Sequence, residues 1–188
     1  MSCPVTINHR FELGWHLNKL GLTGRGVEIG VFEGQNARAI LDAWDGIKVY
    51  LVDPYITQDK SEYLDGCNID DFNSAYAKAS KQLAPYYPRY QFIKEYSDKA
   101  SKLFNDCELD FVYIDGNHRY SAVMKDVDCW WPKVKQGGVL AGHDYKDAFI
   151  DGIWDCGVKK AVDEWALRNN IELGFTMEDV VTWYCVKK

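Results

Sequence analysis

The chain has 188 residues, 47% hydrophobic and 27% charged, a balance typical of one globular domain with a sizeable core. Its formal net charge of -6 argues against nucleic acid as a partner, because phosphate binding requires a basic surface. No stretch approaches the roughly 20 apolar residues of a membrane span, and no signal-peptide pattern is present. Six cysteines are scattered without a CxxC pair. We expect a reduced, cytoplasmic protein without a membrane partner.

The N-terminal segment is predicted to form a helix with apolar residues on two faces. Leu13, Leu17 and Leu20 share one face of this helix, whereas Phe11 and Trp15 fall on another. We expect the helix to be packed on both sides or to act as a lid over a binding site.

Short apolar runs rich in Val, Ile, Tyr and Phe follow, each flanked by Gly, Asp or Pro, and they predict buried strands. The five runs are Val27–Val31, Ile47–Val52, Tyr90–Ile93, Leu109–Ile114 and Val139–Ala141. Apolar residues at helical spacing separate or follow these runs. They fall between Ala37 and Trp44, Ile69 and Leu83, Val123 and Trp131, and Val158 and Ala166. Alternating strands and helices indicate a parallel sheet.

Two final apolar runs, Ile171–Phe175 and Val180–Val186, have only four residues between them. Because four residues cannot form a crossover helix, we expect an antiparallel hairpin here. No internal repeat, low-complexity tract or linker is visible. The sequence therefore predicts one domain over residues 1–188, in which residues 1–24 form the N-terminal helical element.

The turn after the first predicted strand carries an ExGxxxG pattern, in which the glycines permit close approach of the backbone to a ligand. A carboxylate at Glu28 would repel a pyrophosphate but suits the ammonium and sulfonium charges of S-adenosylmethionine. The alternative is an ordinary turn with a solvated glutamate. The residues of this turn expected to contact the ligand are Glu28, Gly30, Val31, Phe32 and Gly34.

Two further strand ends face the same crevice. Asp53 ends the second strand, about 20 residues beyond the glycines, where a carboxylate can bind a ribose diol. Alternatively, Asp53 only starts a turn, because Pro54 follows it. Ser97, with its neighbours Tyr96 and Asp98, would reach the adenine side, although Ser97 is equally suited to capping a helix.

Asp and His residues follow both the fourth and the fifth strand. Asp115 and His118 lie beyond the fourth strand, and His143 and Asp144 end the fifth. Because adjacent parallel strands lie about 5 Å apart, the four side chains can converge. They are candidate general bases and candidate ligands for Mg²⁺ or Mn²⁺. The alternative is that the aspartates cap turns and the histidines make ordinary hydrogen bonds.

The segments GVEIGVFEGQNARAIL, VYLVDPY and LDFVYIDGNHRYSAVMKDVDCWWPKVKQGGVLAGHDY resemble the class I S-adenosylmethionine-dependent methyltransferases. More narrowly, they are similar to a small branch with IDGxHxY and GGxxxxHD strand ends. This resemblance implies a Rossmann-like, doubly wound α/β sheet of seven strands, ordered 3-2-1-4-5-7-6, with the last strand antiparallel and helices on both faces. It also implies donor contacts at Glu28, Gly30, Gly34 and Asp53, and we add Asp115 and Gly116 to the candidate donor-binding residues.

The cation-dependent O-methyltransferases of this class hold acidic metal ligands at the ends of strands four and five. The corresponding residues here are Asp115, His143 and Asp144. His143 departs from that pattern, since an acidic ligand is expected at its position. We assign candidate catalytic roles to Asp115, His118 and His143.

We therefore expect an S-adenosylmethionine-dependent methyltransferase that acts on a small hydroxylated acceptor of the sugar or phenol type, with transfer to nitrogen left open. Water exclusion would fall to the helix around Trp15 and His16 and to the segment Tyr55–Asp71. One alternative is a nicotinamide-dependent oxidoreductase, which the missing GxGxxG disfavours. Another is a binding module without turnover. The oligomeric state stays open, with a homodimer as one option.

Overall fold

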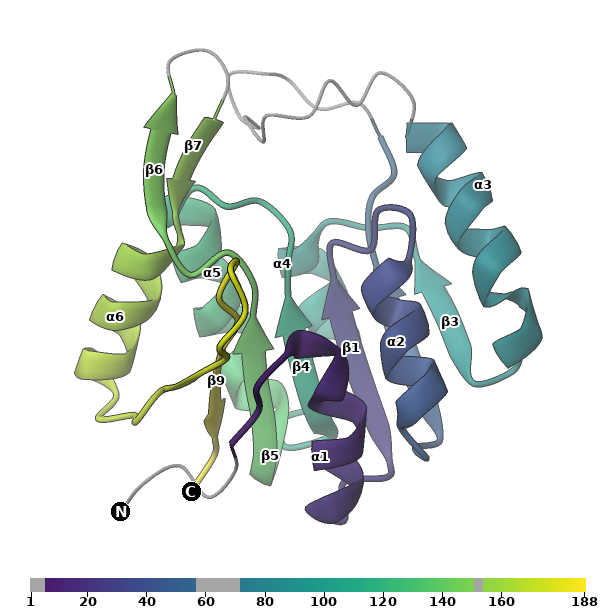
Figure 1. The fold of residues 1–188 in the computed structure, drawn as a ribbon, viewed down its shortest axis with the longest axis horizontal. Helices are drawn as coiled ribbons and strands as arrows, with labels where there is room; N and C mark the ends of the chain where they lie inside the picture. The colour runs from purple at the N-terminus through teal and green to yellow at the C-terminus, as the bar shows by residue number, and fades with distance from the viewer. Residues whose placement is uncertain (1–5, 57–71, 151–153) are drawn as a thin grey trace.

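A mixed sheet of seven strands forms the centre of the computed structural model, which describes residues 6–56, 72–150 and 154–188 (Figure 1). The order of its strands is β3-β2-β1-β4-β5-β9-β8. β1 to β5 run parallel, whereas β9 is antiparallel to β5 and to β8. The strands are β1 (Arg25–Ile29), β2 (Lys48–Val52), β3 (Tyr90–Ile93), β4 (Leu109–Ile114), β5 (Val134–Gly142), β8 (Gly174–Phe175) and β9 (Trp183–Val186).

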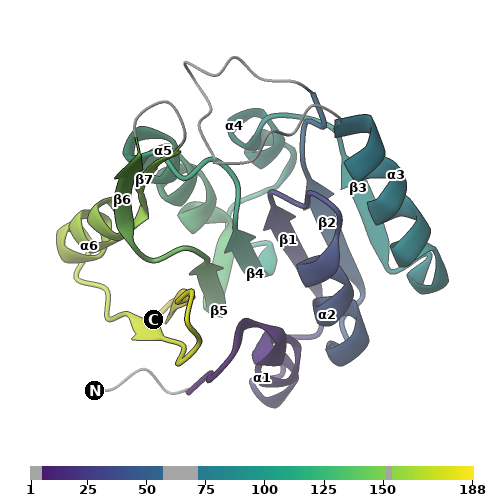
Figure 2. The same ribbon diagram turned by 45° about the horizontal axis from the view of Figure 1, so that its top comes forward.

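Helices cover both faces of the sheet (Figures 1 and 2). The α-helices are α1 (Leu13–Lys19), α2 (Gln35–Ala43), α3 (Phe72–Leu83), α4 (Ser97–Ala100), α5 (Tyr120–Trp130) and α6 (Val158–Arg168). Short 3₁₀ helices lie at Arg10–Glu12, Ala84–Tyr86, Ser101–Leu103 and Trp131–Lys133. Within the described ranges, no helix has the length and apolar character that crossing a membrane requires.

Two apolar cores, one on each face, follow from the alternation of side chains along the strands. In β4 all six residues are buried, as expected for a parallel strand covered on both sides. Phe111 and Tyr113 pack in the core beneath α1, α2 and α3. Val112 and Ile114 pack in the opposite core, beneath α4, α5 and α6.

The observed sheet confirms the predicted order and the antiparallel last strand, since β8 and β9 are its sixth and seventh strands along the chain. A hairpin of β6 (Asp147–Ile150) and β7 (Trp154–Gly157) was not expected. It stands beyond the carboxyl end of β5, beside α6 (Figure 1). The N-terminal helix buries Leu13 and Leu17 but leaves Trp15 60% exposed, so only one of its two apolar faces is packed.

A buried carboxylate ties the start of β1 to β4 and β5. Asp110, in β4, is 2% exposed. It accepts a hydrogen bond from the backbone N–H of Gly24 and forms an ion pair with Lys135. Loss of the carboxylate leaves a part-buried amide and an ammonium without their acceptor, which is costly.

We predict that Asp110→Ala lowers the free energy of unfolding by about 2 to 3 kcal/mol, measured by urea denaturation. The matched control is Asp106→Ala, which removes a 69% exposed carboxylate paired with Lys133. The control should cost less than about 1 kcal/mol, because exposed ion pairs contribute little. Equal losses in the two variants would contradict the role assigned to Asp110.

Candidate active site

The turn between β1 and α2 has the conformation that its glycines predict. Gly30 and Gly34 have φ values of 80° and 87°, in the left-handed region. A Cβ atom on Gly30 would collide with the carbonyl oxygen of Asp115 at the end of β4. The turn therefore lies directly against β4, and only glycine fits at position 30.

Asp53 holds this turn in place. Its Oδ2 accepts hydrogen bonds from the N–H groups of Val31 and Phe32, each at 3.0 Å, and its Oδ1 accepts one from Tyr55 at 2.9 Å. Burial raises the pKa of Asp53, and the three backbone hydrogen bonds oppose that rise. The turn-forming alternative thus describes a real part of its role, while Oδ1, which accepts one hydrogen bond, can accept a second.

Glu28 is 1% exposed at the end of β1, and its carboxyl is only half satisfied. Its Oε1 accepts a hydrogen bond from Asn36 Nδ2 at 3.2 Å. The Oε2 of Glu28 and the Oδ1 of Asn36 are buried without a hydrogen-bond partner. Burial, reinforced by the charges of Asp115 and Asp53, raises the pKa of Glu28 to about 8. The site thus presents two buried oxygens without a hydrogen-bond partner. Once Glu28 has lost its proton, both can accept hydrogen bonds from a cationic donor.

A cavity of about 680 Å³ joins the strand ends. Glu28, Gly30 and Asp53 line one part of it, and Gly116 lines the wall between β1 and β4. Ser97, the first residue of α4, lines it as well and accepts a hydrogen bond from Trp130 Nε1 at 2.8 Å.

The sequence analysis missed Asp126, which lines the same cavity from α5. Burial raises its pKa to about 7, although a hydrogen bond with Ser97 opposes the shift. An acidic residue on the buried face of a predicted helix, beside Val123 and Val127, was the available signal.

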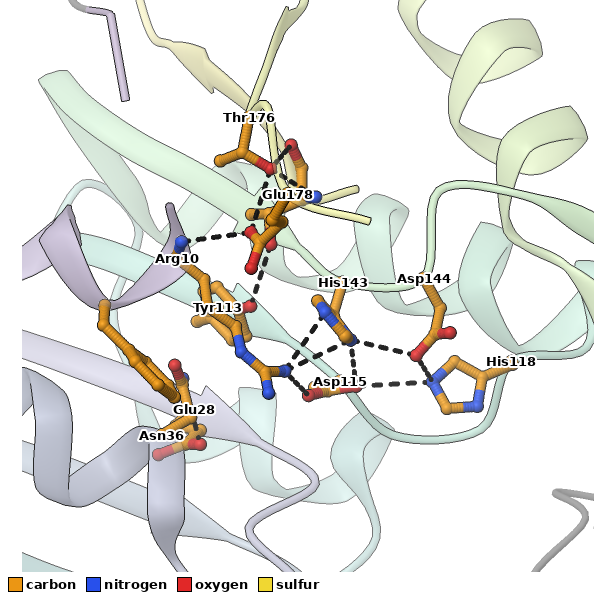
Figure 3. A network of polar contacts seen from close by, with 12 residues as sticks. Arg10, Glu28, Asn36, Tyr113, Asp115, His118, His143, Asp144, Thr176 and Glu178 are labelled. Carbon is orange, nitrogen blue, oxygen red and sulfur yellow. Dashed lines mark hydrogen bonds and ion pairs between the residues drawn. The ribbon is translucent and has the colours of Figure 1, made fainter. Parts of the chain in front are cut away.

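The Asp and His residues at the ends of β4 and β5 do converge (Figure 3). His118 Nε2 lies 3.3 Å from Asp115 Oδ1 and 3.4 Å from Asp144 Oδ2. His143 Nδ1 lies 3.0 Å from the same oxygen of Asp144. Burial raises the pKa of Asp144, but the hydrogen bonds from His143 and Lys146 and the charge of His118 outweigh it and lower the pKa overall.

The three residues whose ligand atoms best fit one metal ion are Asp115, His118 and Asp144. One ligand atom from each lies within 4.8 Å of the others. The set predicted from the sequence had His143 in place of His118. In the structure, the ring nitrogens of His143 lie 3.1 and 3.3 Å from Arg10 Nη1 (Figure 3). A carboxylate pair with one imidazole suits Mg²⁺ or Mn²⁺.

Arg10 is the second residue that the sequence analysis missed. It lies in the short helix before α1, and its side chain lines the cavity next to Asp115 and His143. The sequence analysis had instead assigned Trp15 and His16 to this wall. Of the other expected lid, Tyr55–Asp71, residues 57–71 lie outside the described residues. Tyr55 itself is buried and donates a hydrogen bond to the carbonyl of Phe32 at 2.9 Å.

The fold and the turn at the end of β1 define a class of protein, the methyltransferases with a Rossmann-like sheet. The chain belongs to a methyltransferase domain family, Methyltransf_24, whose model matches residues 27–145. That match covers well over half of the 188 residues. The relationship to class I S-adenosylmethionine-dependent methyltransferases expected from the motifs is thereby confirmed.

An uncharacterised protein of Acanthamoeba polyphaga mimivirus is 29% identical over 125 residues, which are 64% of this chain and 51% of that protein. The chain therefore spans about half the length of this curated relative.

Several solved structures share the fold. The O-methyltransferase TomG of Streptomyces achromogenes, in complex with S-adenosylmethionine, superposes with a TM-score of 0.63 at 14% identity, covering 95% of this chain and 80% of TomG. An O-methyltransferase family protein of Burkholderia thailandensis superposes with a TM-score of 0.66 at 9% identity, and the match covers 95% of this chain and 55% of that protein. An rRNA methylase of Streptococcus thermophilus superposes with a TM-score of 0.63 at 11% identity, and the match covers 97% of this chain and 99% of that protein. At these identities the likeness establishes the fold alone.

The raised pKa of Glu28 gives a test of the site without any ligand. The folded carboxyl keeps its proton up to about pH 8, whereas an ordinary glutamate releases it near pH 4.5. Between these values the unfolded chain binds fewer protons, so stability falls as pH rises and levels off above pH 8.

We predict that Glu28→Gln removes the fall in stability that the wild type shows between about pH 4.5 and pH 8. The variant should match the wild type near pH 4.5 and exceed its free energy of unfolding by a few kcal/mol above pH 8, measured by denaturation at several pH values. Glu172→Gln, at an exposed carboxyl, serves as the control and should follow the wild type throughout. A constant difference between Glu28→Gln and wild type across this range would refute the buried, protonated glutamate.

Proposed function

We propose that this protein is an S-adenosylmethionine-dependent O-methyltransferase that acts on a small hydroxylated molecule of the sugar or phenol type. The observation that carries the proposal is the buried, half-satisfied carboxyl of Glu28 beside the Gly30 turn. An ammonium group can donate to both unpartnered oxygens there, that is, Oε2 of Glu28 and Oδ1 of Asn36. S-adenosylmethionine supplies such an ammonium, together with an electrophilic methyl group.

The cavity wall also fits the rest of that donor. Asp53 keeps a lone pair on Oδ1 for a ribose hydroxyl, and Ser97 and Asp126 offer polar atoms to an adenine. The residues near the strand ends of β4 and β5 then lie on the acceptor side. Methyl transfer from a sulfonium is an in-line displacement, so the protein mainly aligns the two reactants and excludes water.

On the acceptor side, His118 or His143 removes the hydroxyl proton, and Asp115 and Asp144 orient the two imidazoles through the contacts described above. Asp115, His118 and Asp144 are the residues that would hold a divalent ion, which would lower the pKa of a bound hydroxyl. We also propose that residues 1–188 form a single domain, that the protein is cytoplasmic and that its acceptor is a small molecule.

The donor site is tested by the protons released on binding. Below pH 8 Glu28 is protonated in the free protein, and an ammonium beside it favours the anion. We predict that S-adenosylhomocysteine binding at pH 7 releases close to one proton, measured by calorimetry in buffers of different ionisation enthalpy. Glu28→Gln should release none and bind at least tenfold more weakly. Binding of NAD(H) in place of S-adenosylhomocysteine would instead favour the oxidoreductase alternative.

The metal site is tested by measuring how tightly Mn²⁺ binds to the protein saturated with S-adenosylhomocysteine. Electron paramagnetic resonance of the free ion gives the fraction of Mn²⁺ that stays unbound. We expect Asp115→Asn, Asp144→Asn and His118→Ala each to weaken binding at least tenfold, because each removes one ligand. His16→Ala is the matched control, since its ring pairs with Glu12 and does not line the cavity, and it should lose less than threefold. His143→Ala should lose less than His118→Ala, because the ring of His143 contacts Arg10 and reaches the site through Asp144. Unchanged Mn²⁺ binding in both aspartate variants would sink the metal proposal, and a larger loss in His143→Ala would restore the ligand set expected from the sequence.

A further inference from the structure

Arg10 brings a guanidinium group to the acceptor side of the cavity (Figure 3). Its Nη1 lies 3.1 Å from His143 Nε2 and 4.0 Å from Asp115 Oδ2. The imidazole is a weak partner for a cation, and the carboxylate is at the outer limit of an ion pair. The positive charge of Arg10 is therefore poorly neutralised by the side chains around it.

Most of the hydrogen-bonding capacity of this guanidinium is unused. A guanidinium has five N–H donors, and those of Nε and Nη2 meet no acceptor among the described residues. The side chain is 27% exposed, and it lines the cavity. It thus presents a planar pair of donors that matches a carboxylate or phosphate.

The position of Arg10 is fixed by the C-terminal part of the chain. Its backbone N–H donates to Glu178 Oε1 at 3.0 Å, and the same oxygen accepts from Thr176 Oγ1 at 2.9 Å. Nearby, the N–H of Met177 donates to the carbonyl of Asn8 at 2.9 Å. These contacts fix the backbone from which the guanidinium extends, and this lowers the free energy that a ligand spends to order the side chain.

The two ends of the cavity differ in the basic group that each contains. The described residues that line it include seven carboxyl groups and two strongly basic ones, Arg10 and Lys125. Lys125 is engaged by Asp98 at 2.8 Å, on the side of Ser97. On the acceptor side, Arg10 is thus the basic group available to an anion.

We propose that Arg10 binds an anionic group of the methyl acceptor, so that the acceptor is a hydroxylated carboxylate or phosphate ester. This inference rests on the proposed methyltransferase function. Arg10, His143 and Asp144 form a chain of contacts of 3.1 and 3.0 Å. The reacting hydroxyl, held near Asp115, His118 and Asp144, is consequently only a few bonds from the anion. Neighbouring hydroxyl and acidic groups, as in an ortho-hydroxy aromatic acid, satisfy this geometry.

Matched probe pairs test the inference on the protein saturated with S-adenosylhomocysteine. One pair is salicylate and salicylamide, and the other is 2-hydroxyphenyl phosphate and 2-methoxyphenol. Calorimetry at pH 7 gives the ratio of dissociation constants, neutral over anionic, within each pair. In the wild type we expect a ratio of about ten to one hundred for at least one pair, and the pair that shows it identifies carboxylate or phosphate.

The variants Arg10→Met and Arg10→Gln should reduce that ratio to about one while retaining S-adenosylhomocysteine binding. Arg168→Met is the matched control, because it removes one positive charge that pairs with Asp128 outside the cavity, and it should keep the wild-type ratio. A wild-type ratio near one in both pairs, or a ratio that survives both Arg10 variants, overturns the inference. Failure of the wild type to bind S-adenosylhomocysteine is a different result, which refutes the methyltransferase proposal itself.

Discussion

The close approach of the β1 turn to the end of β4 is the constraint on which the site depends. Gly30 donates its N–H to Val52 at the end of β2, at 2.9 Å, and Asp115 donates its N–H to Ile29 at 2.8 Å. With no Cβ at position 30, the three strand ends lie against one another. This contact brings the carboxyl groups at the ends of β1, β2 and β4, those of Glu28, Asp53 and Asp115, to one edge of the sheet. A larger residue at position 30 would separate the donor turn from the acceptor side.

That convergence has an electrostatic cost, which the structure meets differently at each carboxyl. Asp53 is stabilised as an anion by three backbone N–H groups. Asp115 has His118 and Arg10 beside it. Glu28 has only the amide of Asn36, so in the free protein it stays protonated up to about pH 8. A cation bound beside Glu28 would stabilise its ionised form. The raised pKa of this carboxyl therefore favours a positively charged ligand at this edge of the sheet.

The sequence predicted the parts of the fold that depend on local patterning. The runs Tyr90–Ile93 and Leu109–Ile114 match β3 and β4 at both ends, because each is a short apolar run bounded by turn residues. Gly30 was also recognisable from local sequence, because glycine is the residue that a left-handed backbone conformation in a turn favours. The β6–β7 hairpin was missed, because each strand has only four residues and β6 is largely exposed, so no long apolar run distinguishes the segment from a loop.

Side-chain directions at the site were less predictable. That Asp115, His118, His143 and Asp144 converge follows from the parallel pairing of β4 and β5. The strand pairing does not decide which histidine completes the candidate metal site. The ring of His143 contacts Arg10 and Asp144, whereas Nε2 of His118 lies at 3.3 and 3.4 Å from Asp115 and Asp144. Arg10 itself precedes α1 and has no periodic or motif signal, so only tertiary packing reveals it. Asp126 was hidden in a similar way, on the buried face of an otherwise ordinary amphipathic helix.

The two halves of the cavity therefore have different origins in the chain. The donor half is built from strand ends within residues 27–145, the part that matches the methyltransferase family. Arg10 lines the far wall, and its backbone N–H donates to Glu178. These two residues lie outside the matched range, one on either side of it. The position of Arg10 thus depends on a contact between the two ends of the chain, in which the carboxylate of Glu178 accepts a hydrogen bond from the backbone N–H of Arg10.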